Sequence, residues 1–302
     1  MKHLTTKSLI ISLSIFFGLS SFIFPQVTTE QLYHGAHSMA LAGSNVAHQT
    51  DAWAAFANPA GLTRVNGMTA AVAYEENLGQ KFLPHSQMTA AMPIGKFGVA
   101  GLSLDRLAVS YAGNTLTTEL AIGFQHGFFL QQDQNSSLAF GYSLKYLQLD
   151  FGKSAGSAGD GSDGIDLGQS RTLGVDIGFL ASLRDRHWVG VRVMNFNRPD
   201  LGQTDNAVDL PRSVQVGVGY SPYDLVWTTF AMTKSAGHVS QYSAGMEYEI
   251  LKGLKILSGV QSNPNRLGLG LRLELQKFVV DYALMTHPVL PLSHQMSLGM
   301  SL

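Results

Sequence analysis

Residues 68–302 form a succession of segments in which large apolar side chains alternate with small or polar ones. In 267–275 every second residue is leucine, and glycine or a charged residue lies between. The same two-residue period recurs in 138–146, 173–179, 213–220 and 296–302. Because successive side chains of a strand point to opposite faces, each segment predicts a β-strand with one apolar and one small or polar face.

Turn residues divide this region into about fourteen predicted strands. They are expected near 68–76, 86–93, 97–111, 115–130, 137–151, 171–183, 187–196, 212–221, 224–234, 239–251, 253–262, 265–275, 277–286 and 293–302. The connections alternate between short turns, as at 93–96 and 184–186, and longer loops at 75–85, 151–170 and 195–211. Outer-membrane barrels have short periplasmic turns, longer extracellular loops and an even number of strands. This spacing therefore predicts an all-β fold, a transmembrane antiparallel β-barrel.

The second face of these strands distinguishes a barrel from a soluble β-sandwich, which also alternates. It consists largely of glycine, alanine and serine, whereas a solvent-exposed face would be rich in lysine, glutamate and threonine. Small residues suit an enclosed lumen in which other backbone approaches closely. The alternation slips near Asp105-Arg106, which predicts a β-bulge, and the phase of 224–234 is ambiguous. A girdle of interfacial aromatic residues is expected from Tyr111, Trp188, Tyr220, Tyr223, Trp227 and Tyr248.

The composition agrees with an envelope protein. Only 14% of the residues are charged, 45% are hydrophobic, the net charge is -1 and cysteine is absent. A nucleic-acid partner is excluded because it would need a basic surface. Residues 1–26 combine Lys2 and Lys7 with a long apolar run, the pattern of a cleaved signal peptide. We expect export to the bacterial outer membrane, with membrane lipid as a partner.

Residues 27–66 lack strand alternation and precede the barrel, which we assign to 67–302. A short helix is predicted from about Asp51 to Phe56, capped by Thr50 or Asp51. The Asn58-Pro59 step is expected to end it, because proline disfavours helical geometry in the residue before it. This segment is expected to fold into the glycine-lined lumen as a hatch.

The ordered set Gly35-Ala36 to Gly43, Asp51-Ala52 and Asn58-Pro59-Ala60-Gly61-Leu62 resembles the N-terminal signature of the PorV/PorQ group. That group belongs to the FadL-like (OMPP1/FadL/TodX) superfamily of outer-membrane barrels. The closing segments "SNPNRLGLGLRL", "VVDYALMTHPVL" and "SHQMSLGMSL" are also similar to it. The chain departs from the group's pattern at Ala42, Thr50 and Leu302.

This resemblance implies a fourteen-stranded barrel with an N-terminal hatch in its lumen. The residues that match the hatch motif are Asp51, Asn58, Pro59, Ala60, Gly61 and Leu62. It implies one of two activities, namely passive uptake of small hydrophobic compounds or an accessory role in type IX secretion.

Residues that carry reaction chemistry are scattered, and neither an enzyme nor a cofactor is expected. The G-x-S-x-G elbow of serine hydrolases is missing. His34 and His37 could face each other across a turn. A metal site there would need further ligands, so ordinary packing is favoured. Asp160, Asp163 and Asp166 offer oxygen ligands for calcium, but the spacing and closing glutamate of an EF-hand are missing. A solvated loop is the favoured interpretation.

Charged residues on the small-residue face are predicted to point into the lumen. They are Lys145, Asp176, Arg192, Glu247, Glu249, Arg272, Glu274 and Asp281. Two roles are open for them, because they could line a polar channel or form ion pairs that hold the hatch. Charges in a confined space are normally paired, which favours the second role.

Three functions remain open from the sequence. Hatch-gated uptake of a hydrophobic small molecule is slightly favoured, because the external loops are modest in size for a docking platform. The alternatives are a secretion barrel that binds secreted or surface proteins, and a structural envelope barrel. A continuous apolar pocket beside the hatch would support uptake, and a packed lumen would oppose it.

Overall fold

The computed structural model describes residues 33–111, 114–154, 156–159, 161–201 and 210–302. The segment expected to be a signal peptide, 1–26, lies outside these residues. None of the described helices is long and apolar enough to cross a membrane.

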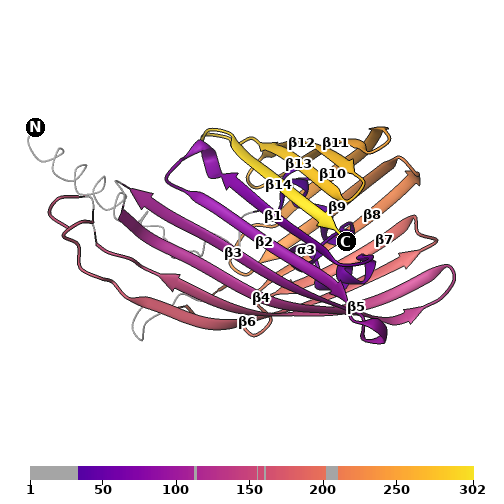
Figure 1. Ribbon diagram of the computed structural model, residues 1–302, viewed down its shortest axis with the longest axis horizontal. Helices are drawn as coiled ribbons and strands as arrows, with labels where there is room; N and C mark the ends of the chain where they lie inside the picture. The colour runs from indigo at the N-terminus through magenta and orange to yellow at the C-terminus, as the bar shows by residue number, and fades with distance from the viewer. Residues whose placement is uncertain (1–32, 112–113, 155, 160, 202–209) are drawn as a thin grey trace, which may run out of the picture.

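Fourteen antiparallel strands close into a barrel in which each strand pairs with its sequence neighbours and β1 pairs with β14 (Figure 1). The strands are β1 Thr69–Glu76, β2 Pro84–Pro93, β3 Val99–Tyr111, β4 Asn114–Gln132, β5 Ser136–Asp150, β6 Gln169–Leu183, β7 His187–Met194, β8 Ser213–Tyr223, β9 Val226–Ser235, β10 Gln241–Leu251, β11 Leu254–Gln261, β12 Arg266–Leu275, β13 Phe278–Met285 and β14 Ser293–Ser301. The predicted fold class and strand number are confirmed. The three long connections predicted at 75–85, 151–170 and 195–211 lie at one end of the barrel, but the β3–β4 and β11–β12 connections at that end are short, so the alternation is only partial.

The outer face of the barrel is a continuous apolar surface. Leu102 of β3 is 60% exposed and Leu144 of β5 is 51% exposed, whereas the residues directly before and after each of them in the strand face inward. The same holds around the ring for Val72, Met88, Phe124, Leu173, Val189, Val216, Phe230, Met246, Ile256, Leu271, Tyr282 and Met296. Closure satisfies the backbone hydrogen bonds without an open edge, so this surface suits contact with lipid.

The strands differ in length, and β3 to β6 extend well beyond the others at the long-loop end (Figure 1). The bulge predicted at Asp105-Arg106 is wrong, because the β2–β3 register runs unbroken through both residues. Asp105 is a buried lumenal residue and Arg106 is exposed on the outer face, so a charge on the outer face disturbed the pattern. The β3–β4 register shifts instead between Val109 and Ser110.

Two of the predicted girdle residues face the lumen. Trp188 is 8% exposed, and the guanidinium of Arg64 lies 3.9 Å from the centre of its ring. Trp227 stacks on His48 at 4.0 Å between ring centres. These two tryptophans pack against the hatch. Tyr220, Tyr223 and Tyr248 are exposed and fit the expected girdle. The side chain of Tyr111 lies outside the described set.

The described part of the hatch, residues 33–66, lies inside the ring of strands (Figure 1). It consists of α2 Ala36–Ala40, the 3-10 turn η2 Asn45–Ala47, α3 Ala54–Ala57 and the 3-10 helix η3 Pro59–Arg64. The helix expected from Asp51 begins three positions later, because the carboxylate of Asp51 accepts the Trp53 N–H at 3.0 Å and forms a turn ahead of it.

The glycines of the barrel wall provide the space that the hatch occupies. At Gly178 a Cβ atom would lie 2.1 Å from Asn58 Oδ1, and at Gly141 it would lie 2.3 Å from Ala60 N. Further wall glycines at which a Cβ would come within 3.0 Å of a hatch atom are Gly127, Gly190, Gly217, Gly245, Gly259, Gly268 and Gly270. Side chains at these positions would therefore exclude the hatch backbone.

The wall glycines predict a direct test of hatch docking. We expect Gly141→Ala to destabilise the docked hatch by about 1–3 kcal/mol, because the new methyl group overlaps the hatch backbone and cannot be accommodated by a side-chain rotation. Limited proteolysis of the detergent-purified barrel should then cleave residues 33–66 about tenfold faster or more. Gly299→Ala is the matched control, since its Cβ would meet other atoms only at 3.7 Å. Equal cleavage rates in the two variants would contradict this packing.

Candidate functional site

The side chain of Asn58 joins the hatch to itself and to the wall. It is 1% exposed, and its amide donates to the carbonyl oxygens of Val46 at 3.1 Å and Phe179 at 3.0 Å. Its Oδ1 accepts the Ala60 N–H at 3.1 Å, which caps η3. The amide of asparagine supplies both donors and an acceptor. A carboxylate in its place could accept but could not donate, so the two donated bonds would be lost.

The remaining residues of the hatch motif pack closely. Pro59 opens η3, where its missing N–H is tolerated. Ala60 is completely buried against the wall, and Leu62 is completely buried in an apolar cluster with Ala55 and Val99. A Cβ atom added at Gly61 would meet Ala54 at ordinary contact distance, so this glycine lies close to α3. The motif is thus a packing element of the lumen.

The hatch meets the remaining strands of the wall as well. Thr89 of β2 donates to the Ala52 carbonyl at 2.9 Å, and Ser297 of β14 accepts the Ala36 N–H at 2.8 Å. The hydroxyls of Ser44 and Thr229 of β9 lie 2.6 Å apart. Ala71 of β1 packs on Trp53, and Ala283 of β13 packs on α2. The wall glycines cover β4–β8 and β10–β12, and His34 contacts Asp105 on β3. The hatch therefore touches each of the fourteen strands.

The first charged group, here called the Arg272 cluster, joins the hatch to β10–β13. Arg272 contacts Asp51 at 2.6 Å, Glu274 at 3.3 Å and Asp281 at 3.5 Å. Lys255 links Glu247 at 3.0 Å to Glu274 at 2.9 Å. Burial opposes the charge on Asp51, but Arg272 outweighs it and lowers the pKa of Asp51 below its usual value.

The second group, the Asp176 cluster, lies on β5–β7. Asp176 is completely buried and contacts Lys145 at 3.0 Å and Arg192 at 2.7 Å. Arg192 also donates to the carbonyl of Phe56 in the hatch. Glu249 belongs to neither cluster, because its carboxylate accepts the Gly253 N–H at 3.1 Å near the short-turn end. The other seven predicted lumenal charges all lie in the two clusters.

A third group, the Asp105 cluster, was missed by the sequence analysis. His85 is completely buried, with Nδ1 at 2.9 Å from Glu75 and Nε2 at 2.5 Å from Asp105. His34 of the hatch contacts the same Asp105 at 2.9 Å. The alternation of β3 places Asp105 on the inward face and could have identified it as a lumenal charge, but the bulge predicted there obscured this position.

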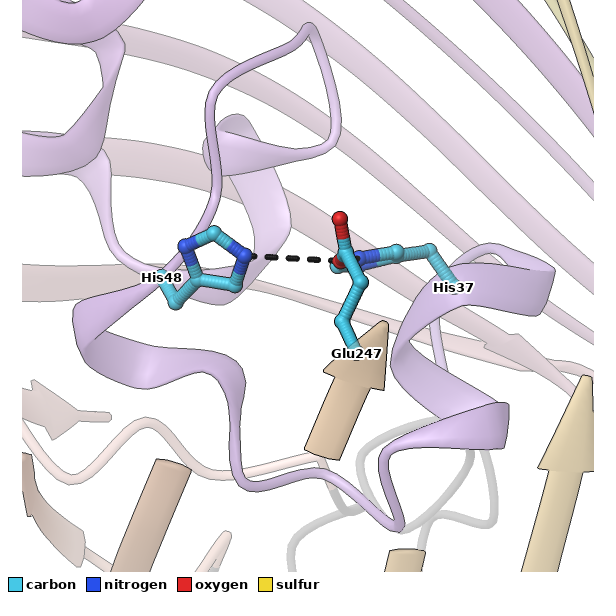
Figure 2. A group of neighbouring side chains, drawn as sticks. All are labelled: His37, His48 and Glu247. Carbon is cyan, nitrogen blue, oxygen red and sulfur yellow. Dashed lines mark hydrogen bonds and ion pairs between the residues drawn. The ribbon is translucent and has the colours of Figure 1, made fainter. Parts of the chain in front are cut away.

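The expectation that His34 and His37 face each other is wrong. His34 points to Asp105 on β3, whereas His37 bonds to Glu247 on β10 at 2.8 Å. Figure 2 shows His37 and His48 on opposite sides of the Glu247 carboxylate. Burial lowers the pKa of His48 to about 4, so this imidazole is neutral near pH 7. These three side chains form the one group of potential metal ligands found in the described part of the chain.

The loop aspartates do not gather around a common point among the described residues. Asp163 accepts bonds from the hydroxyl and N–H of Ser157, and Asp166 accepts the Gly168 N–H at 2.8 Å. Asp160 lies outside the described residues. The loop therefore satisfies the two described carboxylates by itself.

Four spaces lie around the hatch among the described residues. A vestibule of about 230 Å³ opens at the long-loop end, and one of about 670 Å³ opens at the short-turn end. Beside the hatch lie two smaller spaces, of about 110 Å³ next to the Arg272 cluster and about 50 Å³ next to the Asp176 cluster. The first is lined mainly by polar and charged side chains, whereas the second combines charged residues with apolar ones such as Phe56, Leu147 and Met194. At these volumes neither forms a continuous apolar conduit past the hatch.

The family described as type IX secretion system membrane protein PorP/SprF matches residues 85–299. The chain belongs to this family. It is an outer-membrane β-barrel of a type IX secretion family. The PorV/PorQ group named in the sequence analysis is a finer assignment that stays a prediction. No curated protein matches the chain.

Solved structures show the same fold. The toluene transporter TodX of P. putida has a TM-score of 0.62 at 10% identity, over 89% of this chain and 99% of that one. A Pseudomonas aeruginosa FadL homologue has a TM-score of 0.59 at 12% identity, over 89% of this chain and 98% of that one. At these identities the likeness shows the FadL-like fold alone.

The Asp51–Arg272 pair predicts a pH-dependent hatch. Because Asp51 has a lowered pKa in the folded protein, its stabilisation is complete above the unfolded pKa of about 4 and is lost as the pH falls through the folded value. We expect Asp51→Asn to cost about 1.5–3 kcal/mol at pH 7 and progressively less below pH 4.

Tryptophan fluorescence provides the measurement for this variant. The chain has 3 tryptophans, and Trp53, Trp188 and Trp227 all lie in or against the hatch. Thermal melts of wild type and Asp51→Asn at pH 7 and pH 3 should show a gap that narrows at low pH. A gap of the same size at both pH values would refute the role of this ion pair.

Proposed function

We propose that this protein is a non-enzymatic accessory barrel of type IX secretion, in the manner of the PorV/PorQ group, with its lumen closed by the hatch. The observation that carries the proposal is the contact of the hatch with each of the fourteen strands. A barrel closed in this way serves as a scaffold in the membrane, and the long-loop end is left to bind secreted or surface proteins.

The charges of the lumen support a fixed hatch. Moving it would separate Asp51 from Arg272, His34 from Asp105 and the Phe56 carbonyl from Arg192. Breaking a buried ion pair by removing one partner is strongly destabilising, by about 3–5 kcal/mol, because the other charge is left uncompensated. Two contacts between charged or ionisable side chains and one hydrogen bond from Arg192 to a backbone carbonyl, on different walls, oppose a spontaneous opening.

The long-loop end offers an apolar surface for a protein partner. Val289 is 86% exposed and Ile165 is 75% exposed. Phe82, Leu290 and Leu292 of the same end are also exposed. These side chains come from three loops at this end, and large exposed apolar side chains in loops are available for contact with a partner.

We further propose that residues 1–26 are removed on export, 27–66 form the hatch and 67–302 form the barrel.

Passive uptake of a small hydrophobic compound is the second candidate. The FadL-like fold favours it, because solved barrels of this fold include a monoaromatic hydrocarbon channel. In this chain uptake requires part of the hatch to move, since the two spaces beside it are small and charged. The two candidates therefore differ in whether the hatch moves.

A disulfide that locks the hatch separates them. Ser44 and Thr229 have hydroxyls 2.6 Å apart, and the chain contains no cysteine, so Ser44→Cys/Thr229→Cys would form a single bridge. In the bacterium that carries the gene, deletion should reduce secretion of type IX substrates. Both wild type and the locked variant should restore it fully, because the accessory role does not need hatch movement.

The two single-cysteine variants are the controls, and non-reducing gels verify the bridge. If deletion leaves secretion unchanged, the accessory role is refuted and uptake or a structural barrel remains. If the locked variant restores function only after reduction, the hatch is a gate and the closed-scaffold proposal fails.

A further inference from the structure

The cluster of His37, His48 and Glu247 brings three metal-ligating side chains to one point inside the barrel (Figure 2). His37 comes from α2, His48 follows η2, and Glu247 comes from the wall strand β10. Each is at most 6% exposed, and their ligand atoms lie within 4.8 Å of one another. Two parts of the hatch thus converge on one carboxylate of the wall.

The spacing of the cluster fits a zinc ion. Glu247 Oε2 lies 2.8 Å from His37 Nε2 and 3.5 Å from His48 Nε2. Zinc binds imidazole nitrogen at about 2.0–2.1 Å and carboxylate oxygen at about 2.0–2.2 Å, which in a tetrahedron separates neighbouring ligands by roughly 3.3 Å. Small side-chain shifts are enough to place one ion between the three atoms.

Protein partners alone leave His48 unsatisfied. Its Nδ1 is buried without a hydrogen-bond partner among the described residues, and its Nε2 contact with Glu247 is long at 3.5 Å. Stacking on Trp227 at 4.0 Å fixes the ring so that Nε2 faces the carboxylate. An ion bound to Nε2 supplies a close partner for that nitrogen. Nδ1 then carries the proton, and a buried donor of this kind calls for a bound water.

The surroundings of His37 orient its second nitrogen toward the same point. Its Nδ1 lies 3.2 Å from Gln49 Oε1. The orientation of the Gln49 amide is fixed because Asn45 donates to Oε1 at 2.8 Å and Nε2 donates to Asp51 at 2.6 Å. The His37 Nδ1–H therefore donates to Gln49 and leaves the Nε2 lone pair for a metal, which is the usual support of a metal-binding histidine.

The charges nearby allow one ligand oxygen to remain free. Lys255 takes Glu247 Oε1 at 3.0 Å and leaves Oε2 to the two imidazoles. Arg64 and Arg272 also line the adjoining space, and Asp51, Glu274 and Asp281 balance the positive charges. This space of about 110 Å³ leaves room for a water as fourth ligand.

We propose that His37, His48 and Glu247 bind one divalent transition-metal ion, zinc foremost, which fastens the hatch to β10. Two imidazoles and one carboxylate select zinc and its neighbours over calcium and magnesium, which prefer oxygen ligands alone. This inference does not depend on the proposed secretion role, because any function of the barrel needs the hatch to be held or released.

The test uses the full-length barrel in detergent with a tag free of histidine, stripped of metal with a chelator. Titration with Co²⁺ should give the visible absorption of a four- or five-coordinate ion at one ion per barrel, and Zn²⁺ should displace it. His48→Gln and Glu247→Gln should each weaken binding by more than about 100-fold, and Gln49→Leu by about 10–100-fold.

His34→Gln is the matched control, since His34 is also a hatch histidine paired with a wall carboxylate but lies outside the cluster. It should bind Co²⁺ as wild type does. Heat-modifiable gel migration verifies that each variant is folded. Should a ligand variant not fold, X-ray absorption of the zinc-loaded wild type must still show two imidazoles and a carboxylate. No stoichiometric binding by wild type, a zinc shell without imidazole, or full binding by both ligand variants would overturn the proposal.

Discussion

The close approach of the hatch backbone to the barrel wall is the constraint on which the rest of the structure depends. Gly141 and Gly178 lack a Cβ where one would overlap Ala60 and Asn58. Protein interiors are packed to the density of organic crystals, so contacts this close restrict the hatch to very few positions in the lumen. Once that placement is fixed, every polar group of the lumen has to find its partner around it, and the wall sequence reflects this with glycine on one face and lipid-facing apolar residues on the other.

The charges of the lumen follow from the same enclosure. Water is displaced by the hatch, and an unpaired charge in so confined a space would be costly. Asp176 is accordingly paired with two cations of the wall, and Asp105 with one histidine of the wall and one of the hatch. Such pairs add little net stability compared with apolar packing, but they specify which hatch residue meets which strand. The three clusters are thus best understood as positioning devices for the hatch on three sides of the barrel.

Much of this fold could be predicted from the sequence, because a two-residue period and turn residues act locally. The fourteen strands follow from the turn residues, and the lumenal side of Lys145, Asp176 and Arg272 follows from the period. What could not be predicted depends on contacts across the lumen. His37 and Glu247 are separated by 210 positions and meet only because the hatch folds back inside the barrel. Trp188 and Trp227 resemble girdle residues by their place in the strand, and only the presence of Arg64 and His48 explains their inward packing.

Whether such a hatch can act as a gate is a question of how much of it must move. Release of the whole segment would break contacts with all fourteen strands. Opening on this scale approaches the free energy of global unfolding, which is typically about 5–15 kcal/mol. A local movement is far cheaper. Phe56 and Ala57 border the long-loop vestibule, and a shift there would break the bond from Arg192 to the Phe56 carbonyl and the stacking of Phe56 on His34. Even this shift would expose charged side chains to the path, which suits a polar passenger better than an apolar one. The chemistry of the lumen therefore favours a scaffold closed by its hatch over a conduit for hydrocarbons.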